Sequence, residues 1–369
     1  MKNKKYKNVV VGAGITGITI AERLASRGEE VLIIEKRDHI GGNCYDYFDK
    51  NGNYIQRYGP HAFHTKDKEV WDYLSNFTEW QDYEHKVLAY IEGKLVPIPF
   101  NLNSIEKCFS KEEAEKMKKK LIEIFGKGKN VPILELKKEE DKLIKKLADY
   151  VYEKVFLHYT MKQWDLKPEE IDPSVTARVP VSISRDNRYF QDKYQEMPKE
   201  GFTEMFKNML SDPKIKLRLE TDFKDVEEDY DYERLFYTGP IDEFFNYEYG
   251  KVKYRNAKWR FEKHKTRSYQ KTTQVNYPNI KSFTRVTEFN KYLNLENCPT
   301  VIAKEFPSWN KGYSAWPVKT DKNNKKIKKY KDQIEKLKDI FFVGRLAESK
   351  YYNIDEAVKR GMELIKNVK

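Results

Sequence analysis

The feature that most constrains the fold is the stretch at residues 9–43, VVVGAGITGITIAERLASRGEEVLIIEKRDHIGGN. An apolar run at 7–11 leads into Gly12-x-Gly14-x-x-Gly17, then an amphipathic segment at 15–27 and a second apolar run at 30–35. This order predicts a strand, a tight turn, a helix and a parallel strand. The glycines permit close approach of a pyrophosphate to the helix N-terminus. Glycine turns without a ligand also occur, so the motif alone leaves that alternative open.

Glu35 ends the second apolar run, where a carboxylate accepts a hydrogen bond from a ribose 2′-hydroxyl and disfavours a 2′-phosphate. Lys36 to Asn43 then read KRDHIGGN, which resembles the second glycine motif of FAD enzymes such as amine oxidases and desaturases. IFFVGRLAES at 340–349, followed by a turn and an apolar-periodic segment, resembles the motif that closes such folds on the flavin side. These resemblances favour FAD over NAD.

The chain has 369 residues and a formal net charge of +12, enough length for two or three packed units. Many lysines fall in runs at 116–120, 137–146 and 322–338, mixed with acids at helical spacing, which is typical of exposed helix faces. A basic nucleic-acid binder is the alternative, but we expect no nucleic-acid partner. Three cysteines without CxxC spacing predict neither a disulfide framework nor a metal site. This cysteine usage fits a protein of the reducing cytoplasm.

No run of about 18 apolar residues occurs, so we expect no membrane span. The N-terminus is basic and then apolar, but glycines interrupt the apolar run and a charged helix follows. We therefore interpret this segment as a strand, a turn and a helix rather than as an export signal.

Along the rest of the chain, 87–98 predicts a hairpin, 104–170 helices, 175–195 and 251–310 strands, 325–338 a helix, and 354–368 a closing helix with Asn353 as N-cap. We therefore expect an α/β protein with a doubly wound, Rossmann-like FAD-binding domain. A helical domain and an antiparallel β-sheet domain are inserted into it. The FAD domain is discontinuous (1–85, 196–245 and 325–369), the helical domain covers 102–174, and the sheet domain covers 86–101, 175–195 and 246–324.

Several motifs together carry a more specific resemblance. YGPHAFHT at 58–65 and YTMKQW at 159–164 resemble YGPHxFHT and YTxKQW of the UDP-galactopyranose mutase family. Its RLPV and DNNYF motifs resemble RVPV at 178–181 and DNRYF at 186–190, and FYTGP at 236–240, Thr284-Arg285 and GRLAE at 344–348 match in order. The resemblance covers nearly the whole chain, and the first two motifs are far more discriminating than the glycine turn.

This family interconverts pyranose and furanose forms of a nucleotide sugar, using reduced FAD as nucleophile at the anomeric carbon without net redox change. The resemblance therefore implies an isomerase with a nucleoside-diphosphate sugar as substrate and a reductant such as NADPH to activate the flavin. It also implies a homodimer, with a role in bacterial capsule or lipopolysaccharide synthesis. The alternative is a redox flavoenzyme of the amine oxidase or desaturase type, which would change the mass of its substrate.

The resemblance also assigns roles to residues. Those matching catalytic positions are Arg178 and Arg285, which hold the diphosphate, and His64 near the flavin. Those matching substrate-binding positions are Phe156, Tyr159, Thr160, Trp164, Tyr189, Asn276, Trp316 and Tyr351. Those matching cofactor-binding positions are Gly12, Gly14, Gly17, Glu35, Lys36, Gly42, Asn43, His61, Arg345 and Asn353.

The sequence departs from the family at several positions. Trp316 stands where the family carries a diphosphate-binding Tyr, and Asn353 stands where it carries an Asp beside the flavin. His158 replaces a Gly near the base pocket, Ser182 an Arg, and Glu196 a Gly. Because several changes fall near the nucleotide and phosphate, the base and the sugar of the substrate stay open.

Overall fold

The computed structural model describes residues 4–167, 170, 180–296, 299–309 and 313–368, with only the backbone of residues 4 and 313–316. Two compact units divide the chain. Unit 1 comprises residues 1–83, 192–256 and 313–369, and unit 2 comprises residues 84–191 and 257–312. The three-domain division expected from the sequence stays a prediction.

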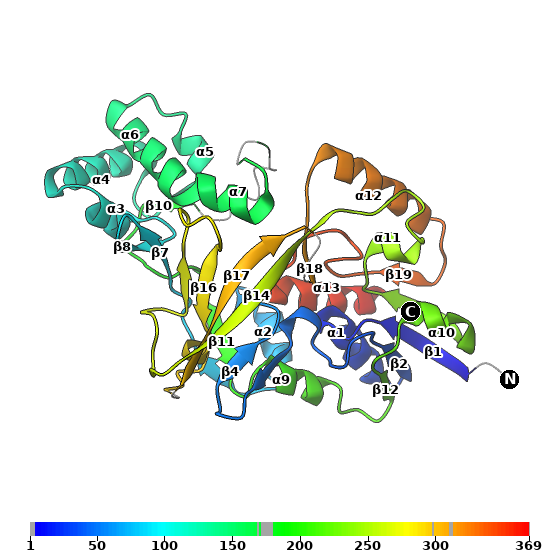
Figure 1. Cartoon of the computed structure of the whole chain (residues 1–369). Helices are drawn as coiled ribbons and strands as arrows, with labels where there is room; N and C mark the ends of the chain where they lie inside the picture. Colours follow the sequence, from blue (N-terminus) through cyan, green and yellow to red (C-terminus); the bar gives the residue numbers. More distant parts are fainter. Residues whose placement is uncertain (1–3, 168–169, 171–179, 297–298, 310–312, 369) are drawn as a thin grey trace. The chain divides into compact units, whose positions relative to one another are not determined.

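A five-stranded parallel sheet forms the centre of unit 1 (Figure 1), in the order β12-β2-β1-β13-β19. Its strands are β1 (Lys4–Val11), β2 (Val31–Ile34), β12 (Ile215–Arg218), β13 (Tyr230–Tyr237) and β19 (Ile340–Phe342). The chain order along the sheet is 3-2-1-4-5, so the direction of winding reverses between β1 and β13. In open α/β sheets, ligands bind outside the carboxyl ends of the strands at this switch point. The expected Rossmann-like fold is confirmed.

The described residues of unit 1 also form several α-helices. They are α1 (Ile15–Ala25), α2 (Lys68–Leu74), α9 (Phe202–Met209), α10 (Phe223–Val226), α11 (Ile241–Phe244), α12 (Asp321–Ile334) and α13 (Ile354–Asn367). α13 lies along α1, where a Cβ on Gly361 would stand 3.1 Å from Thr19, so the glycine allows the close approach. The lysine-rich helix α12 begins four residues earlier than predicted, because Thr320 caps it by accepting from the Asn323 N–H.

Short antiparallel strands complete unit 1. The pair β3 (Asp46–Phe48) and β4 (Tyr54–Gln56) forms a hairpin, and β5 (Phe63–Thr65), β11 (Tyr194–Pro198) and β6 (Trp80–Asp82) form a three-stranded sheet in that order. β18 (Tyr313–Pro317) is the remaining strand of this unit.

In unit 2, strands neighbour one another in the order β14-β17-β16-β15-β7-β8. They are β7 (Val87–Ile91), β8 (Lys94–Ile98), β14 (Tyr254–His264), β15 (Gln274–Asn276), β16 (Arg285–Glu288) and β17 (Thr300–Ser308). The predicted hairpin at 87–98 is β7 and β8, joined at Glu92 and Gly93, both with positive φ. β15 runs antiparallel to β16 but parallel to β7, so the sheet is mixed rather than purely antiparallel.

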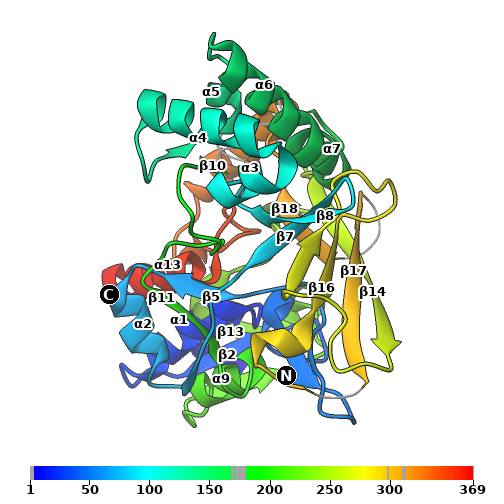
Figure 2. The same cartoon turned by 90° about the vertical axis from the view of Figure 1, so that its left-hand side faces the viewer.

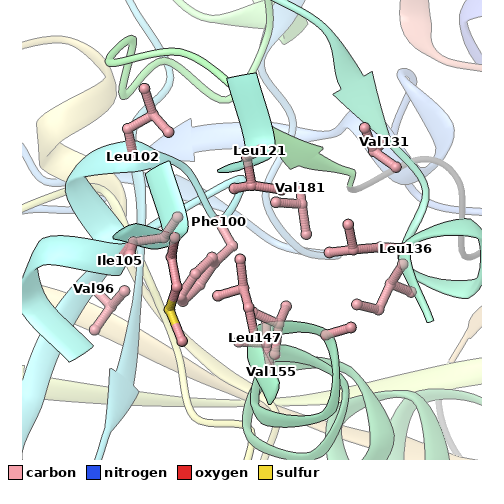
Figure 3. Packing of buried hydrophobic residues seen from close by; sticks show 14 of the residues in the cluster. Val96, Phe100, Leu102, Ile105, Leu121, Val131, Leu136, Leu147, Val155 and Val181 are labelled. Carbon is pink, nitrogen blue, oxygen red and sulfur yellow. The ribbon is translucent and has the colours of Figure 1, made fainter. Parts of the chain in front are cut away.

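Helices of unit 2 follow the hairpin (Figure 2): α3 (Leu102–Cys108), α4 (Lys111–Phe125), α5 (Ile133–Leu136), α6 (Lys142–Val151) and α7 (His158–Trp164). A π-helical turn, Tyr152–Leu157, joins α6 to α7, and Asn101, Ser110 and Asp141 cap α3, α4 and α6. Their apolar faces bury a shared core (Figure 3), in which Phe100, Leu121 and Leu147 are almost fully enclosed.

The strands expected over 175–195 are mostly wrong within the described part of that range. Only Val181–Ser182 (β10), paired with Asn130–Val131 (β9), and the start of β11 at Tyr194 are extended strands. Between them, Asp186 accepts from the backbone N–H and the guanidinium of Arg188, and Asn101 donates to the carbonyl of Asp186. These side-chain bonds replace a strand ladder.

Candidate functional site

The first glycine turn follows β1 at the switch point of the parallel sheet. Gly12 has φ +102°, and a Cβ there would stand 2.2 Å from Oγ1 of Thr238, the residue after β13. A Cβ on Gly17 would stand 2.0 Å from the carbonyl oxygen of Gly12, so α1 approaches the turn too closely for any side chain. The turn therefore needs glycine, and the N–H groups of the first turn of α1 begin directly after Gly14.

A second glycine turn packs against the first. The Gly41 N–H donates to the carbonyl of Ala13 at 2.8 Å, and a Cβ on Gly42 would stand 3.0 Å from Cα of Gly14. Both Gly41 and Gly42 have positive φ. Asn43 follows and accepts from the Arg37 guanidinium at 3.0 Å. Two glycine turns thus lie together beside a helix N-terminus, and this arrangement fits the binding of a dinucleotide.

Glu35 links these turns. Its side chain is only 6% exposed, and its two oxygens accept from the backbone N–H of Ala13 at 2.7 Å and of Arg37 at 2.9 Å. A carboxylate oxygen can accept more than one hydrogen bond, so both bonds are compatible with a further bond from a ribose hydroxyl. Lys36, by contrast, points to the exposed carboxylate of Glu243, 3.4 Å away.

The predicted C-terminal cofactor residues lie around the start of α13. Arg345 donates to the carbonyl of Tyr352 at 2.5 Å, and its guanidinium lies 4.7 Å from the centre of the Tyr351 ring. Asn353 is the N-cap of α13, as predicted, and its backbone N–H donates to Glu356 at 2.7 Å. Within unit 1, Tyr351 therefore lies beside the predicted cofactor residue Arg345.

The two histidines of YGPHAFHT are held differently. Gln56, fully buried, accepts from the His61 N–H at 2.6 Å and donates to the His61 carbonyl at 2.8 Å. His64 is buried on β5, and its Nδ1 lies 2.5 Å from Oδ2 of Asp192. A carboxylate on Nδ1 fixes the orientation of the imidazole ring and favours a proton on that nitrogen.

In unit 2, YTMKQW forms α7. Thr160 is buried, and burial raises the pKa of the Tyr159 phenol while the positive charge of Arg285 opposes that rise, which places Tyr159 within the field of the arginine. Trp164 is the last residue of α7 and is partly exposed. Phe156 belongs to the helical core, so its packing accounts for its position without a ligand.

Arg285 begins β16 and forms an ion pair with a buried carboxylate. Its Nε lies 2.5 Å from Oε2 of Glu305 on β17, and its side chain is 18% exposed while that of Glu305 is fully buried. Thr284 donates to the same carboxylate at 2.9 Å. The negative charge of Glu305 raises the pKa of Arg285 against the opposing effect of burial, so the guanidinium stays charged.

The remaining predicted substrate residues are only partly placed by the structure. Tyr189 packs edge-on against His85 and against the helical core. Asn276 ends β15 and accepts from Gln274 at 2.9 Å. Arg178 and the side chain of Trp316 lie outside the described residues.

Sequence reasoning missed the partners of these residues. Glu305 is the one acid in the run VIAKEF, whose other residues apart from Lys304 are apolar, and an acid in such a run was a usable signal for a buried ion pair. No sequence pattern indicated the roles of Asp192 and Gln56. The role of Asp192 depends on strands that pair across more than 100 residues, and the role of Gln56 depends on a turn of the backbone.

Among the described residues, no group of three or more His, Cys, Asp or Glu side chains could hold a metal ion. No helix in the same part of the chain is long and apolar enough to cross a membrane.

Comparison with known proteins shows which families the chain resembles. The UDP-galactopyranose mutase family model matches residues 154–351, and a model for NAD(P)-binding Rossmann-like domains matches residues 10–77. A probable UDP-galactopyranose mutase of Klebsiella pneumoniae is 34% identical over 100% of this chain and 96% of its own length. The dTDP-fucopyranose mutase of Escherichia coli is 34% identical over 97% of each.

The crystal structure of reduced UDP-galactopyranose mutase superposes with a TM-score of 0.74 at 16% identity, covering 99% of this chain and 93% of that one. A horse flavin-containing amine oxidase matches over only 26% of this chain, which disfavours the redox alternative. These findings confirm the expected class of enzyme, an isomerase, and FAD as its cofactor. The chain belongs to the UDP-galactopyranose mutase family.

Proposed function

We propose that the protein interconverts the pyranose and furanose forms of a nucleoside-diphosphate sugar, with UDP-galactose or a variant in sugar or base as substrate. The observation that carries the proposal is Arg285, a charged guanidinium that is mostly buried and held by a fully buried carboxylate. A diphosphate is both the handle and the leaving group of such a substrate. A preorganised cation stabilises the charge that develops on it as the bond to the sugar breaks.

The other residues of unit 2 supply recognition in this proposal. Trp164 offers a flat face for the base, and stacking of this kind contributes about 1–3 kcal/mol. Tyr159 brings a phenol, kept protonated by burial, within the field of Arg285. Arg178 is proposed as the second diphosphate-binding arginine on the family motif alone.

In unit 1, the two glycine turns and Glu35 are proposed to hold the pyrophosphate and ribose of FAD, with Asn43, Arg345 and Asn353 beside them. Reduced FAD supplies a nucleophile for the anomeric carbon, so the reaction needs no net oxidation. His64 keeps a fixed ring orientation through Asp192, 2.5 Å away, and can therefore hold a neighbouring polar group in one place.

The test is a panel of UDP-, dTDP- and GDP-sugars incubated with dithionite-reduced protein and resolved by chromatography with mass detection. The two relatives are named for different bases and sugars, UDP-galactopyranose and dTDP-fucopyranose, so both belong in the panel. We expect one sugar to give a new peak of unchanged mass, only when the flavin is reduced. A product of altered mass, or no product from any sugar with reduced FAD bound, would contradict the proposal.

Arg285→Ala should lower turnover at least about 100-fold, because one donor to a developing charge contributes on that order. FAD content should not change, since the proposed cofactor residues lie in unit 1. Arg260→Ala is the matched control, because Arg260 is exposed on β14 and pairs with Glu262. Near-normal turnover in Arg285→Ala would remove this residue from the site.

We further infer, on family grounds, a cytoplasmic homodimer activated by a reductant such as NADPH, in the synthesis of capsule or lipopolysaccharide. Light scattering tests the oligomeric state, and anaerobic bleaching of the flavin absorbance by NADPH tests the reductant.

A further inference from the structure

Lys162, the fourth residue of YTMKQW, makes an arrangement that the proposed chemistry does not use. Its Nζ donates to three backbone carbonyls, those of Tyr277 and Ile280 at 2.5 Å each and that of Phe283 at 2.9 Å. An ammonium group has three donors and no acceptor. Its hydrogen bonds therefore match three carbonyls spaced three residues apart in one loop.

That loop connects two of the predicted substrate residues. β15 ends at Asn276 and β16 begins at Arg285, and the loop between them closes on itself through the Tyr277 N–H, which donates to the carbonyl of Thr284 at 2.8 Å. Lys162 thus ties α7, which carries Tyr159 and Trp164, to the segment that sets the start of β16. All of these residues belong to unit 2.

Two further contacts fasten the same short helix. At its start, His158 lies 3.0 Å from the side-chain oxygen of Asn279, whose amide donates to the carbonyl of Lys154 at 3.1 Å. At its end, Asp165 has φ +57° and accepts from the indole N–H of Trp309 at 2.7 Å. His158 replaces a small glycine expected in the family, so this chain has a contact that a glycine could not make.

We propose that Lys162 is a positioning residue. By donating hydrogen bonds to three carbonyls of the 277–283 loop, it holds the nucleotide-binding face of α7 in a fixed position relative to Arg285. This fixed position sets the affinity for the nucleotide. The proposal rests on the proposed function, because it takes Trp164 and Arg285 as the contacts of base and diphosphate. Lys162 itself needs no contact with the substrate. Its three donors are already directed at protein carbonyls.

Burial fits this role. Desolvation lowers the pKa of Lys162 to about 8, and the carbonyl oxygens favour the charged form that they surround. A lysine that gives up hydration for three backbone acceptors is costly to replace, because each carbonyl would lose its donor.

The experiment compares the wild type, Lys162→Met and the control Lys154→Met, using UDP, dTDP and GDP alone as probes with the oxidised protein. Lys154 lies on the same run of helix, and among the described residues its side chain pairs with Glu153 and Glu92 at the surface. We expect Lys162→Met to raise the Kd of the nucleotide that the wild type binds at least tenfold, and Lys154→Met to leave it within twofold. In turnover, Lys162→Met should raise KM while kcat falls less than threefold.

A merely structural role gives a different pattern, because a misfolded fraction lowers the apparent kcat and leaves KM unchanged. Asn279→Ala removes two exposed hydrogen bonds at the other side of the loop and should raise Kd in the same direction by a smaller factor. An unchanged Kd in Lys162→Met, or a loss confined to kcat, would overturn the inference while the wild type still binds nucleotide. A wild type that binds none of the three nucleotides would overturn the proposed function and this inference with it.

Discussion

Replacing Glu305 by Gln tests the ion pair on which the proposed diphosphate contact depends. Glu305 is fully buried, and its oxygens meet Nε and the terminal guanidinium nitrogen of Arg285 at 2.5 and 3.2 Å. Glutamine keeps the shape but presents an amide donor to the guanidinium. It removes the charge that balances Arg285, and breaking a buried pair on one side costs about 3–5 kcal/mol where neither partner can reach water. Arg285 is 18% exposed, so we expect a smaller loss of stability, about 2 kcal/mol.

The effect on activity follows from the orientation of the guanidinium. An arginine released from Glu305 loses, on average, one charge-assisted hydrogen bond to the diphosphate, about 1.5–3 kcal/mol. This corresponds to a fall in kcat/KM of about ten- to 150-fold. The assay is the rate of isomerisation by the reduced enzyme, with urea unfolding measured in parallel.

Glu262→Gln is the matched control, because Glu262 pairs with Lys304, the residue next to Glu305 on β17, at a partly exposed position. It should leave kcat/KM within about twofold, as for other exposed ion pairs. A wild-type kcat/KM in Glu305→Gln would refute the reasoning that this carboxylate holds the arginine in its working orientation.

Three further predictions concern the rest of the chain. Leu121→Ala should lower the free energy of unfolding by about 2–5 kcal/mol, because this side chain is fully buried in the helical core, whereas Ile122→Ala, at an exposed position, should cost less than about 1 kcal/mol in urea titrations. Hydrogen bonds from Arg185 and a neighbouring lysine lower the pKa of Glu106 to about 2, so its contribution is fully present above pH 4.5 and is lost as the pH falls through 2; Glu106→Gln should therefore lower Tm slightly at pH 7 and by clearly less at pH 2.5. Burial raises the pKa of the Cys44 thiol to about 12, so iodoacetamide at pH 8 should leave Cys44 unmodified in the native protein and label it after unfolding, as read by peptide mass mapping.

Local sequence patterns predicted the start of the cofactor unit well. The run from Val9 to Asn43 specifies its two strands, helix and glycine turns through residues next to one another, and the positive φ values of Gly12 and Gly41 follow from the same short segment. The closing helix and its Asn353 N-cap were also predictable, because capping is a local interaction.

Long-range pairing limited prediction of the candidate site. Glu305 meets Arg285 because β16 and β17 are antiparallel neighbours, and Asp192 meets His64, 128 residues away in the sequence, because β11 pairs with β5. Lys162 lay inside a recognised motif, yet its partners are backbone carbonyls, which carry no side-chain signature. The strand prediction around Arg188 failed because local ion pairing competed with strand formation.

The most direct test of the central claim counts turnovers against flavin. One equivalent of reduced enzyme, held anaerobically without further reductant, is mixed with an excess of the nucleotide sugar that it accepts, and product and flavin absorbance are followed together. An isomerase without net redox change predicts many turnovers per flavin, a product of unchanged mass, and a flavin that is still reduced at the end. Product limited to one equivalent, or differing in mass by two hydrogens with a change in the flavin spectrum, would contradict the account and favour a redox flavoenzyme.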